Sequence, residues 1–304
     1  MTRLNVASVG AGAFGRHHAR HLAAHPNVAT LTVIDADLAR ATAVAAEHGA
    51  RAATTIAPDA MDAAIIAAPT EAHAALALPF LTAGRPVFIE KPIAQTKAEA
   101  DRLIAAAVAS GTFIQVGHIE RFSAAFEALA GAVYKPRHIV ATRHNPPRAT
   151  APKVDVVRDL MIHDIDLALA IAGAPVDAVS ATALAPHGQE AARATLTFAN
   201  GVVADLSASR LSPSVSRTLT VYDAAGVLHA DLAVMTVTRT AQGAAHTLPV
   251  AHGRDNLAVE LDEFLRVVAG EGRPRVDGLA GRAALGVADR VRAAIATAAL
   301  KLSA

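Results

Sequence analysis

The chain has 304 residues, of which 53% are hydrophobic and 18% charged, and its formal net charge is +1. This length allows one large or two ordinary domains, and the near-neutral charge balance does not predict nucleic-acid binding. The absence of cysteine excludes disulfides, thiol catalysis and cysteine-based metal sites. No signal-peptide core opens the chain, and the longest apolar stretch, 103–117, is interrupted by polar residues. We therefore expect a soluble, cytoplasmic protein that binds neither nucleic acid nor membrane.

Short apolar strands alternate with helical stretches over residues 4–117. The pattern predicts strands at 4–10, 29–35, 63–69, 86–90 and 113–117, and helices at 13–25, 36–48, 71–83 and 96–109. This order is typical of parallel strands joined by crossover helices. The first part of the chain is therefore predicted to be an α/β Rossmann domain with a doubly wound parallel sheet, covering residues 1–119.

The pattern changes after about residue 120. A helix near 122–130 and a longer one over about 156–172 precede alternating strands, with helices at 256–269 and 279–300 closing the chain. The clearest strands flank Asn200-Gly201, a strong hairpin signal, and 216–223 and 226–240 continue the sheet. Residues 120–304 are thus predicted to form an α+β domain with a large, mostly antiparallel open sheet. Its exposed face and edges favour a homodimer or homotetramer formed through the sheet.

The first predicted strand runs directly into Gly10-Ala11-Gly12-Ala13-Phe14-Gly15 and then a helix. Gly10 permits a tight turn, Gly12 lets a pyrophosphate approach the backbone, and Gly15 lets the helix pack closely on the strand. The helix N-terminus supplies free N–H groups for phosphates. Asp35 ends the second strand, where a carboxylate binds the adenine ribose. These features predict NAD as the cofactor; Arg40, which lies near enough to meet a 2′-phosphate, is a mild argument for NADP.

Further candidate cofactor residues follow the third and fourth predicted strands. Carboxyl ends of strands in a doubly wound sheet face the ligand crevice, so Pro69, Thr70 and His73 are candidates, as are Glu90 and Lys91. Thr70 is also a plausible helix N-cap, with His73 at the third helical position, and capping alone would explain it. The histidine-rich run at 16–21 suggests a metal site, but its arginines would repel a cation, so we expect a solvated face of the first helix.

Taken in order, the glycine loop, Asp35, the Pro-Thr strand end with His73, and Glu90-Lys91-Pro92 resemble the glucose–fructose oxidoreductase / inositol dehydrogenase (Gfo/Idh/MocA) family. The resemblance covers nearly the whole chain. It implies a Rossmann domain followed by an α/β domain built on an open antiparallel sheet. It also implies that Lys91 stands near the nicotinamide and the substrate, and that Asp159 and His163 complete the site from a helix of the second domain. The glycine run that precedes this aspartate in the family is replaced here by residues 154–158.

The stretch Asp159-Leu-Met-Ile-His163-Asp164-Ile-Asp166 places four ionisable residues in an apolar segment. A metal site, a catalytic acid/base group and a solvated helix face are the three interpretations. Metal is disfavoured because cysteine and an HExxH motif are both absent. Asp159, His163 and Asp166 share one face of a regular helix, from which Asp164 points away by about 100°. Apolar neighbours cover the other directions, so the polar face is predicted to line a cleft and to transfer protons.

The predicted reaction is the oxidation of an alcohol by NAD⁺. His163 is expected to act as general base and Asp159 to orient it, while Lys91 bonds the same hydroxyl. Burial beside the positive nicotinamide is expected to lower the pKa of Lys91, so that Lys91 can also accept a proton. The sequence leaves open which of Lys91 and His163 accepts the proton first.

Residues 117–123, Gly-His-Ile-Glu-Arg-Phe-Ser, resemble the branch of the family that oxidises the 3-hydroxyl of UDP-N-acetylglucosamine. This resemblance makes a nucleotide sugar the expected substrate and His118, Arg121, Arg143 and His163 its candidate contacts. A basic run also suits a diphosphate, although solvated loops of this kind are equally common; it comprises Lys135, Arg137, Arg143, Arg148, Lys153 and Arg158. The alternatives are a dehydrogenase of a free sugar or polyol such as inositol, and a non-catalytic NAD-binding sensor.

Overall fold

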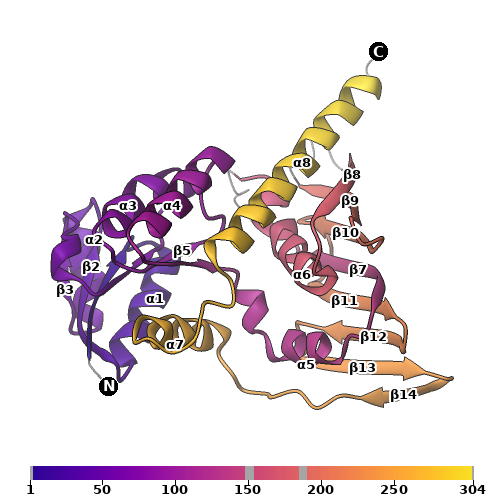
Figure 1. Ribbon diagram of the computed structural model, residues 1–304, viewed down its shortest axis with the longest axis horizontal. Coiled ribbons are helices and arrows are strands. Elements are labelled where there is room, and N and C mark those ends of the chain that lie inside the picture. Colours follow the sequence, from indigo (N-terminus) through magenta and orange to yellow (C-terminus); the bar gives the residue numbers. More distant parts are fainter. Residues whose placement is uncertain (1–2, 148–153, 185–189, 303–304) are drawn as a thin grey trace. The chain divides into compact units, whose positions relative to one another are not determined.

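The computed structural model describes residues 3–147, 154–184 and 190–302, and it divides into two compact units (Figure 1). The first unit comprises Met1–Ile119 and Asp255–Arg282, and the second comprises Glu120–Arg254 and Ala283–Ala304. Residues 255–282, which the sequence assigned to the second domain, therefore belong to the first unit. The physical reason is burial, because Leu257, Leu261 and Phe264 lie in the apolar core of the first sheet.

The first unit is built on a six-stranded parallel sheet with the order β3-β2-β1-β4-β5-β6. Its strands are β1 (Leu4–Val9), β2 (Val28–Ile34), β3 (Arg51–Ala53), β4 (Ala63–Ile66), β5 (Val87–Glu90) and β6 (Ile114–Gly117). Its helices are α1 (Ala13–Ala24), α2 (Leu38–Glu47), α3 (Thr70–Thr82), α4 (Lys97–Ala109) and α7 (Asn256–Val268), with a 3₁₀ turn η1 (Pro58–Ala60). The predicted doubly wound sheet is confirmed, and only the short β3 had not been predicted.

Strand order reverses at β1, because the chain builds β2 and β3 on one side and then crosses to β4, β5 and β6 on the other. Such a reversal leaves a crevice outside the carboxyl ends of the two central strands, where ligands bind in folds of this type. The strands themselves are buried on both faces, as for Val6, Val33 and Ile65, which explains their continuous apolar sequences.

The second unit is built on an eight-stranded sheet with the order β14-β13-β12-β11-β7-β10-β9-β8. Its strands are β7 (Pro136–His144), β8 (Val176–Ala183), β9 (Ala191–Phe198), β10 (Val203–Ser209), β11 (Ser216–Asp223), β12 (Gly226–Asp231), β13 (Thr236–Ala241) and β14 (Ala244–Thr247). Only the pair β7–β10 is parallel among its described ladders. The predicted large, mostly antiparallel sheet is confirmed, although the strand predicted over 226–240 is two strands joined by a turn.

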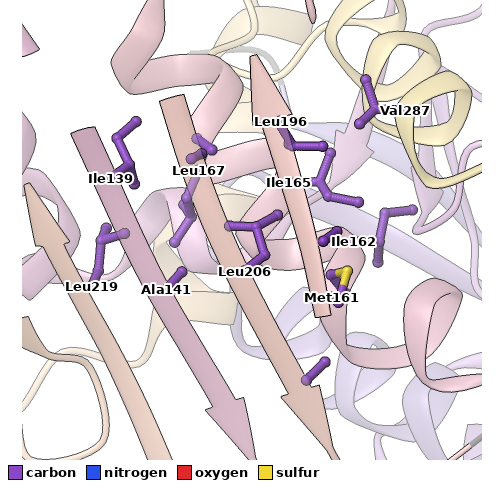
Figure 2. Close-up of a cluster of buried hydrophobic side chains, with 14 of the residues drawn as sticks. Ile139, Ala141, Met161, Ile162, Ile165, Leu167, Leu196, Leu206, Leu219 and Val287 are labelled. Carbon is purple, nitrogen blue, oxygen red and sulfur yellow. The ribbon is translucent and has the colours of Figure 1, made fainter. Parts of the chain in front are cut away.

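Helices cover one face of this second sheet. They are α5 (Ala124–Ala132), α6 (Ile162–Ala172) and the later part of α8 (Gly278–Leu302), and α5 follows the 3₁₀ turn η2 (Ile119–Phe122). Figure 2 shows Ile139, Ala141 and Leu206 of the sheet packed against the side chains of α6. In β7 the buried residues alternate with half-buried ones, so the face of the sheet opposite these helices is the more exposed one there.

The helix predicted over 156–172 is not regular throughout. Residues Val157–Met161 form a π-helical turn (η3), and α6 continues from Ile162. Asp155 caps this N-terminus, since its Oδ1 accepts hydrogen bonds from the backbone N–H groups of Val157 and Arg158, each at 3.1 Å. The wider turn changes the direction of Asp159 relative to His163, and π-helical turns of this kind are frequent at functional sites.

Candidate active site

A cavity of ≈ 1130 Å³ lies in the first unit at the strand-order reversal. Its volume is ample for a dinucleotide, since ligand cavities commonly measure about 300–1,000 Å³. Nine of the twelve residues predicted to bind cofactor line it, namely Gly10, Gly12, Ala13, Phe14, Asp35, Arg40, Pro69, Glu90 and Lys91. The sequence-predicted residues thus come together around one cavity.

The glycine loop fits a pyrophosphate by geometry. Gly10 has φ +104°, and a Cβ there would lie 2.4 Å from the carbonyl oxygen of Ala67. A Cβ on Gly15 would lie 1.8 Å from the carbonyl oxygen of Gly10, so only glycine allows α1 to approach β1 so closely. Gly12 has no heavy atom within 4 Å of an added Cβ, and it precedes α1 with no side-chain cap. Its exposed backbone and the uncapped helix N-terminus suit an anionic group.

Asp35 is oriented by two backbone hydrogen bonds. Its Oδ2 accepts from the N–H of Ala11 at 2.8 Å and its Oδ1 from that of Asp37 at 2.9 Å. The guanidinium of Arg40 lies 3.9 Å from Asp35 Oδ2 and 3.4 Å from Asp37 Oδ2. The backbone N–H of Arg40 lowers the pKa of the exposed Asp37 carboxyl. Two carboxylates at this end of the cavity therefore offer acceptors to a ribose and oppose a 2′-phosphate.

The adenosine end of the cavity also contains residues that sequence reasoning missed. Thr54, Thr55 and Ile56 line the cavity immediately after β3. They were missed because β3 has only three residues, two of them exposed, and so lacks an apolar signature. A pair of threonines before the predicted strand at 63–69 is the signal that could have indicated them.

Glu90 links the cavity wall to α1. Its Oε1 lies 2.7 Å from Nε2 of His18, and its Oε2 accepts from the backbone N–H of Lys91 at 3.1 Å. Burial would raise the pKa of the Glu90 carboxyl, but the bond to His18 and the charges of His18 and Lys91 outweigh burial and lower it. His18 is fully buried, so the predicted solvated face is wrong for this residue. Glu90 is therefore an anion that holds the strand end carrying Lys91.

Thr70 and His73 are not among the residues that line the cavity. Thr70 is the first residue of α3 rather than its N-cap, which is Pro69, so the predicted capping role is wrong. His73 is 1% exposed, with Nδ1 2.9 Å from the carbonyl oxygen of Pro92 and Nε2 2.8 Å from that of Ala68. Burial lowers the pKa of His73, while the two carbonyl groups oppose that effect. His73 thus joins α3 to the loop after Lys91.

The second unit contains the 159–166 stretch, and each of its three aspartates pairs with an arginine. Arg210 Nη1 lies 3.4 Å from Asp159 Oδ2, Arg143 Nη2 lies 2.9 Å from Asp164 Oδ1, and Arg121 Nε lies 3.3 Å from Asp166 Oδ2. Asp164 and Asp166 are each 2% exposed, so this is not the solvated face of a surface helix. Asp159 and His163 are half-buried.

The other predicted substrate contacts are engaged or enclosed. Arg143 is 2% exposed, and its guanidinium binds Asp164 and, at 2.6 Å, Glu120. Burial opposes its charge, but these two carboxylates outweigh burial and raise the pKa of Arg143. His118 is 1% exposed. Arg143 and His118 are thus buried and Arg121 is ion-paired, and direct contact of these three with substrate stays a prediction.

The described residues of the predicted basic run do not form one surface. Lys135 and Arg137 are exposed, whereas Arg158 binds Asp289 at 2.6 Å. Arg148 and Lys153 lie outside the described residues. The described part of the run therefore gives no independent sign of a diphosphate site.

Comparison with known families and proteins supports the same two-part organisation. An oxidoreductase family with an NAD-binding Rossmann fold matches residues 4–118, and a GFO/IDH/MocA C-terminal domain matches residues 104–229. UDP-N-acetylglucosamine 3-dehydrogenase from Acidithiobacillus ferrooxidans is 36% identical, over 97% of this chain and 98% of that protein. Inositol 2-dehydrogenase from Rhizobium meliloti is 29% identical, over 92% and 93%. The predicted NAD cofactor is thereby confirmed.

Similar solved structures have the same two-part organisation. The structure of the Acidithiobacillus ferrooxidans UDP-N-acetylglucosamine 3-dehydrogenase superposes with a TM-score of 0.92 at 33% identity, over 97% of this chain and 98% of that one. An oxidoreductase from Agrobacterium radiobacter in complex with NAD⁺, L-tartaric acid and magnesium gives a TM-score of 0.86 at 16% identity, with 97% of each chain covered. This second likeness concerns the fold. Within the described part of the chain, no helix combines the length and apolar character needed to cross a bilayer.

Proposed function

The chain belongs to the Gfo/Idh/MocA family of NAD-dependent sugar dehydrogenases, and on that premise we propose that it oxidises the 3-hydroxyl of UDP-N-acetylglucosamine, or of a related UDP-sugar, to a ketone. The observation that carries the proposal is the 36% identity with a UDP-N-acetylglucosamine 3-dehydrogenase over 97% of the chain. The inositol dehydrogenase relative is more distant at 29%. The Gly-His-Ile-Glu-Arg-Phe segment at 117–122 supports the same branch.

NAD⁺, when bound, supplies the hydride acceptor for such an oxidation. The glycine loop and the N-terminus of α1 would hold its pyrophosphate, and Asp35 its adenine ribose. Lys91, at the end of β5, lines the same cavity. We assign Lys91 to the reacting hydroxyl, where an ammonium can bond the oxygen and stabilise charge that develops on it.

His163 is assigned as the general base for the hydroxyl proton, a task that imidazole performs well near neutral pH. Asp159 lies one turn earlier, and its carboxylate is paired with Arg210. An anion there would favour the imidazolium that forms when His163 takes the proton. Which of Lys91 and His163 accepts the proton first is a question for pH–rate measurements.

A substrate panel tests the proposal. Purified protein with NAD⁺ should reduce the cofactor with UDP-N-acetylglucosamine, more slowly with UDP-glucose, and negligibly with free N-acetylglucosamine. The physical reason is that the free sugar lacks the uridine diphosphate, whose binding energy positions the reacting carbon. Turnover of free sugars at the rate of the UDP-sugar would refute the branch assignment and leave the dehydrogenase assignment intact.

The alternative is oxidation of a free polyol. Its support is the match to inositol 2-dehydrogenase over 92% of the chain. myo-Inositol belongs in the same panel, and preferential turnover of inositol would establish this alternative. A non-catalytic NAD-binding sensor would reduce no cofactor with any of these compounds, although the presence of both Lys91 and His163 favours an enzyme.

A further inference from the structure

Three arginines from separate elements bind the three aspartates that flank His163 in the sequence. Arg210 follows β10 and binds Asp159, Arg143 lies in β7 and binds Asp164, and Arg121 lies in η2 and binds Asp166. The arginine side chains are only 3%, 3% and 14% exposed, respectively. We call these six residues the arginine–aspartate frame.

The helix does not need this frame in order to pack against the sheet. Met161, Ile162, Ile165 and Leu167 already bury the helix against the sheet (Figure 2). Removing charges from water is unfavourable, and apolar residues of similar volume often stabilise a fold as well as a buried ion pair does. Apolar contacts, however, are non-directional, so they define the rotation of a helix about its axis less sharply than ion pairs with fixed geometry.

The contacts of Arg143 are the most directional of the frame. Its Nε lies 3.1 Å from both oxygens of Asp164, and its Nη2 lies 2.9 Å from Oδ1. Its Nη1 binds Glu120, the neighbour of Arg121, at 2.6 Å. At the other end, Arg210 also binds the backbone carbonyl of Val154 at 2.8 Å and lies 3.3 Å from Glu190. The frame is thus anchored at both ends.

In the sequence, His163 lies among the aspartates of the frame, four residues after Asp159, one before Asp164 and three before Asp166. The π-helical turn η3 ends two residues before it. We propose that the frame fixes the rotation of η3 and α6 and thereby holds the His163 imidazole in its working orientation. Arg121, Arg143 and Arg210 are then positioning residues that act through the aspartates. The inference rests on the proposed function, because it concerns the residue assigned there as the base.

The first test separates positioning from folding. Arg143→Met should lower kcat by roughly 10²-fold, the order expected when a reacting group is misplaced by about 1 Å. The KM for NAD⁺ should not change. Arg143→Met/Asp164→Leu removes one of the two carboxylates that lose Arg143, while Glu120 keeps Arg217 at 3.9 Å. The thermal midpoint should therefore recover in part while kcat stays low. If kcat recovers together with the midpoint, the pair has only a structural role and the proposal is wrong.

A matched control and a milder variant complete this test. Arg239 binds Asp223 through two nitrogens, at 3.2 and 3.0 Å, in the same unit and outside the frame. Arg239→Met should lower the thermal midpoint and leave kcat within about twofold, as expected for a site not coupled to the chemistry. If Arg143→Met does not fold, Arg121→Gln serves instead, because Arg121 is the most exposed arginine of the frame. An equal loss of kcat in Arg239→Met would overturn the proposal.

The second test does not depend on any substrate. The ring-nitrogen resonances of His163, assigned by comparison with His163→Gln, report its tautomer and surroundings in ¹⁵N-histidine-labelled protein. They should shift or broaden in Arg121→Gln and Arg143→Lys and stay unchanged in Arg239→Met. Shifted resonances in a protein that does not oxidise UDP-sugars would uphold the frame and refute the proposed function. Unchanged resonances and kcat in the frame variants would refute the frame alone.

Discussion

Lys91 and His163 are assigned the proton and charge handling of the reaction. Replacing either residue by alanine should lower kcat by roughly two to four orders of magnitude, the usual range for a lost general acid or base. Cofactor affinity should change little for His163→Ala, because the cavity that fits NAD is lined by residues of the first unit. Steady-state kinetics together with NADH titration provide the measurement. Near-native kcat in His163→Ala at neutral pH would refute its assignment as base.

Asp35 should determine the preference for NADH over NADPH. Its carboxylate lies 3.9 Å from Arg40, which Asp37 also holds. Asp35→Asn removes the charge that repels a 2′-phosphate and leaves Arg40 more available to it, so the ratio of the two Kd values should move toward NADPH by at least about tenfold. Fluorescence titration of the wild type and the variant with both reduced cofactors measures this ratio. Tighter binding of NADPH by the wild type would contradict the argument.

Glu90 should contribute a pH-dependent part of the stability. Its pKa lies below the ordinary value of 4.5, because His18 and Lys91 outweigh the effect of burial. Between that lowered pKa and 4.5 the unfolded chain binds more protons than the folded one, so the free energy of unfolding falls as the pH falls through this range. Glu90→Gln should flatten this part of the profile. Urea unfolding at several pH values measures it, and identical slopes for both proteins would contradict the assignment.

At the scale of elements, the packing of α6 on the sheet should dominate the stability of the second unit. Ile165 is fully buried between α6 and the strands in Figure 2. Ile165→Ala should lower the free energy of unfolding by about 2–5 kcal/mol, since it leaves a cavity in a packed core. Val234, in the turn between β12 and β13, is 64% exposed. Val234→Ala should change the stability by less than about 0.5 kcal/mol, and equal losses in denaturant unfolding would refute this account of the core.

The elements that could be predicted from the sequence are those whose packing leaves a periodic pattern. Strands such as β1, β4 and β5 are buried on both faces and appear as short apolar runs, and the hairpin of β9 and β10 is indicated by Asn200-Gly201. The three-residue β3 has no such pattern. The π-helical turn at 157–161 has the same composition as a regular helix, so periodicity did not distinguish it.

The candidate site could be predicted in part, for a related reason. The glycine loop and Asp35 act through local backbone geometry, which a short motif specifies. The arginine partners of Asp159, Asp164 and Asp166 lie 21 to 51 residues away in other elements, from Arg143, 21 residues from Asp164, to Arg210, 51 residues from Asp159. Sequence spacing carries no signal for such pairs. Arg121 and Arg143 were therefore predicted to bind substrate, whereas their charges are engaged by aspartates.

For the whole molecule, we expect assembly through the face of the eight-stranded sheet that lies opposite α5, α6 and α8. Thr142 and its neighbours Ser207 and Thr218 lie half-buried on that face, and Tyr222 is 44% exposed. Sedimentation should give a dimer or tetramer, and Thr142→Arg should shift it toward monomer while circular dichroism stays unchanged. A monomeric wild type at micromolar concentration would contradict this expectation.

The proposed reaction removes hydride from C3 of a UDP-activated N-acetylhexosamine. UDP-N-acetylglucosamine carrying deuterium at C3 tests it directly when incubated with NAD⁺ and the purified protein. Mass spectrometry should find one deuterium in the reduced cofactor. In His163→Ala, the transfer of deuterium from the labelled substrate to the cofactor should be much slower than in the wild type. Reduced cofactor without deuterium would show that another carbon is oxidised, and no reduced cofactor at all would contradict the proposal.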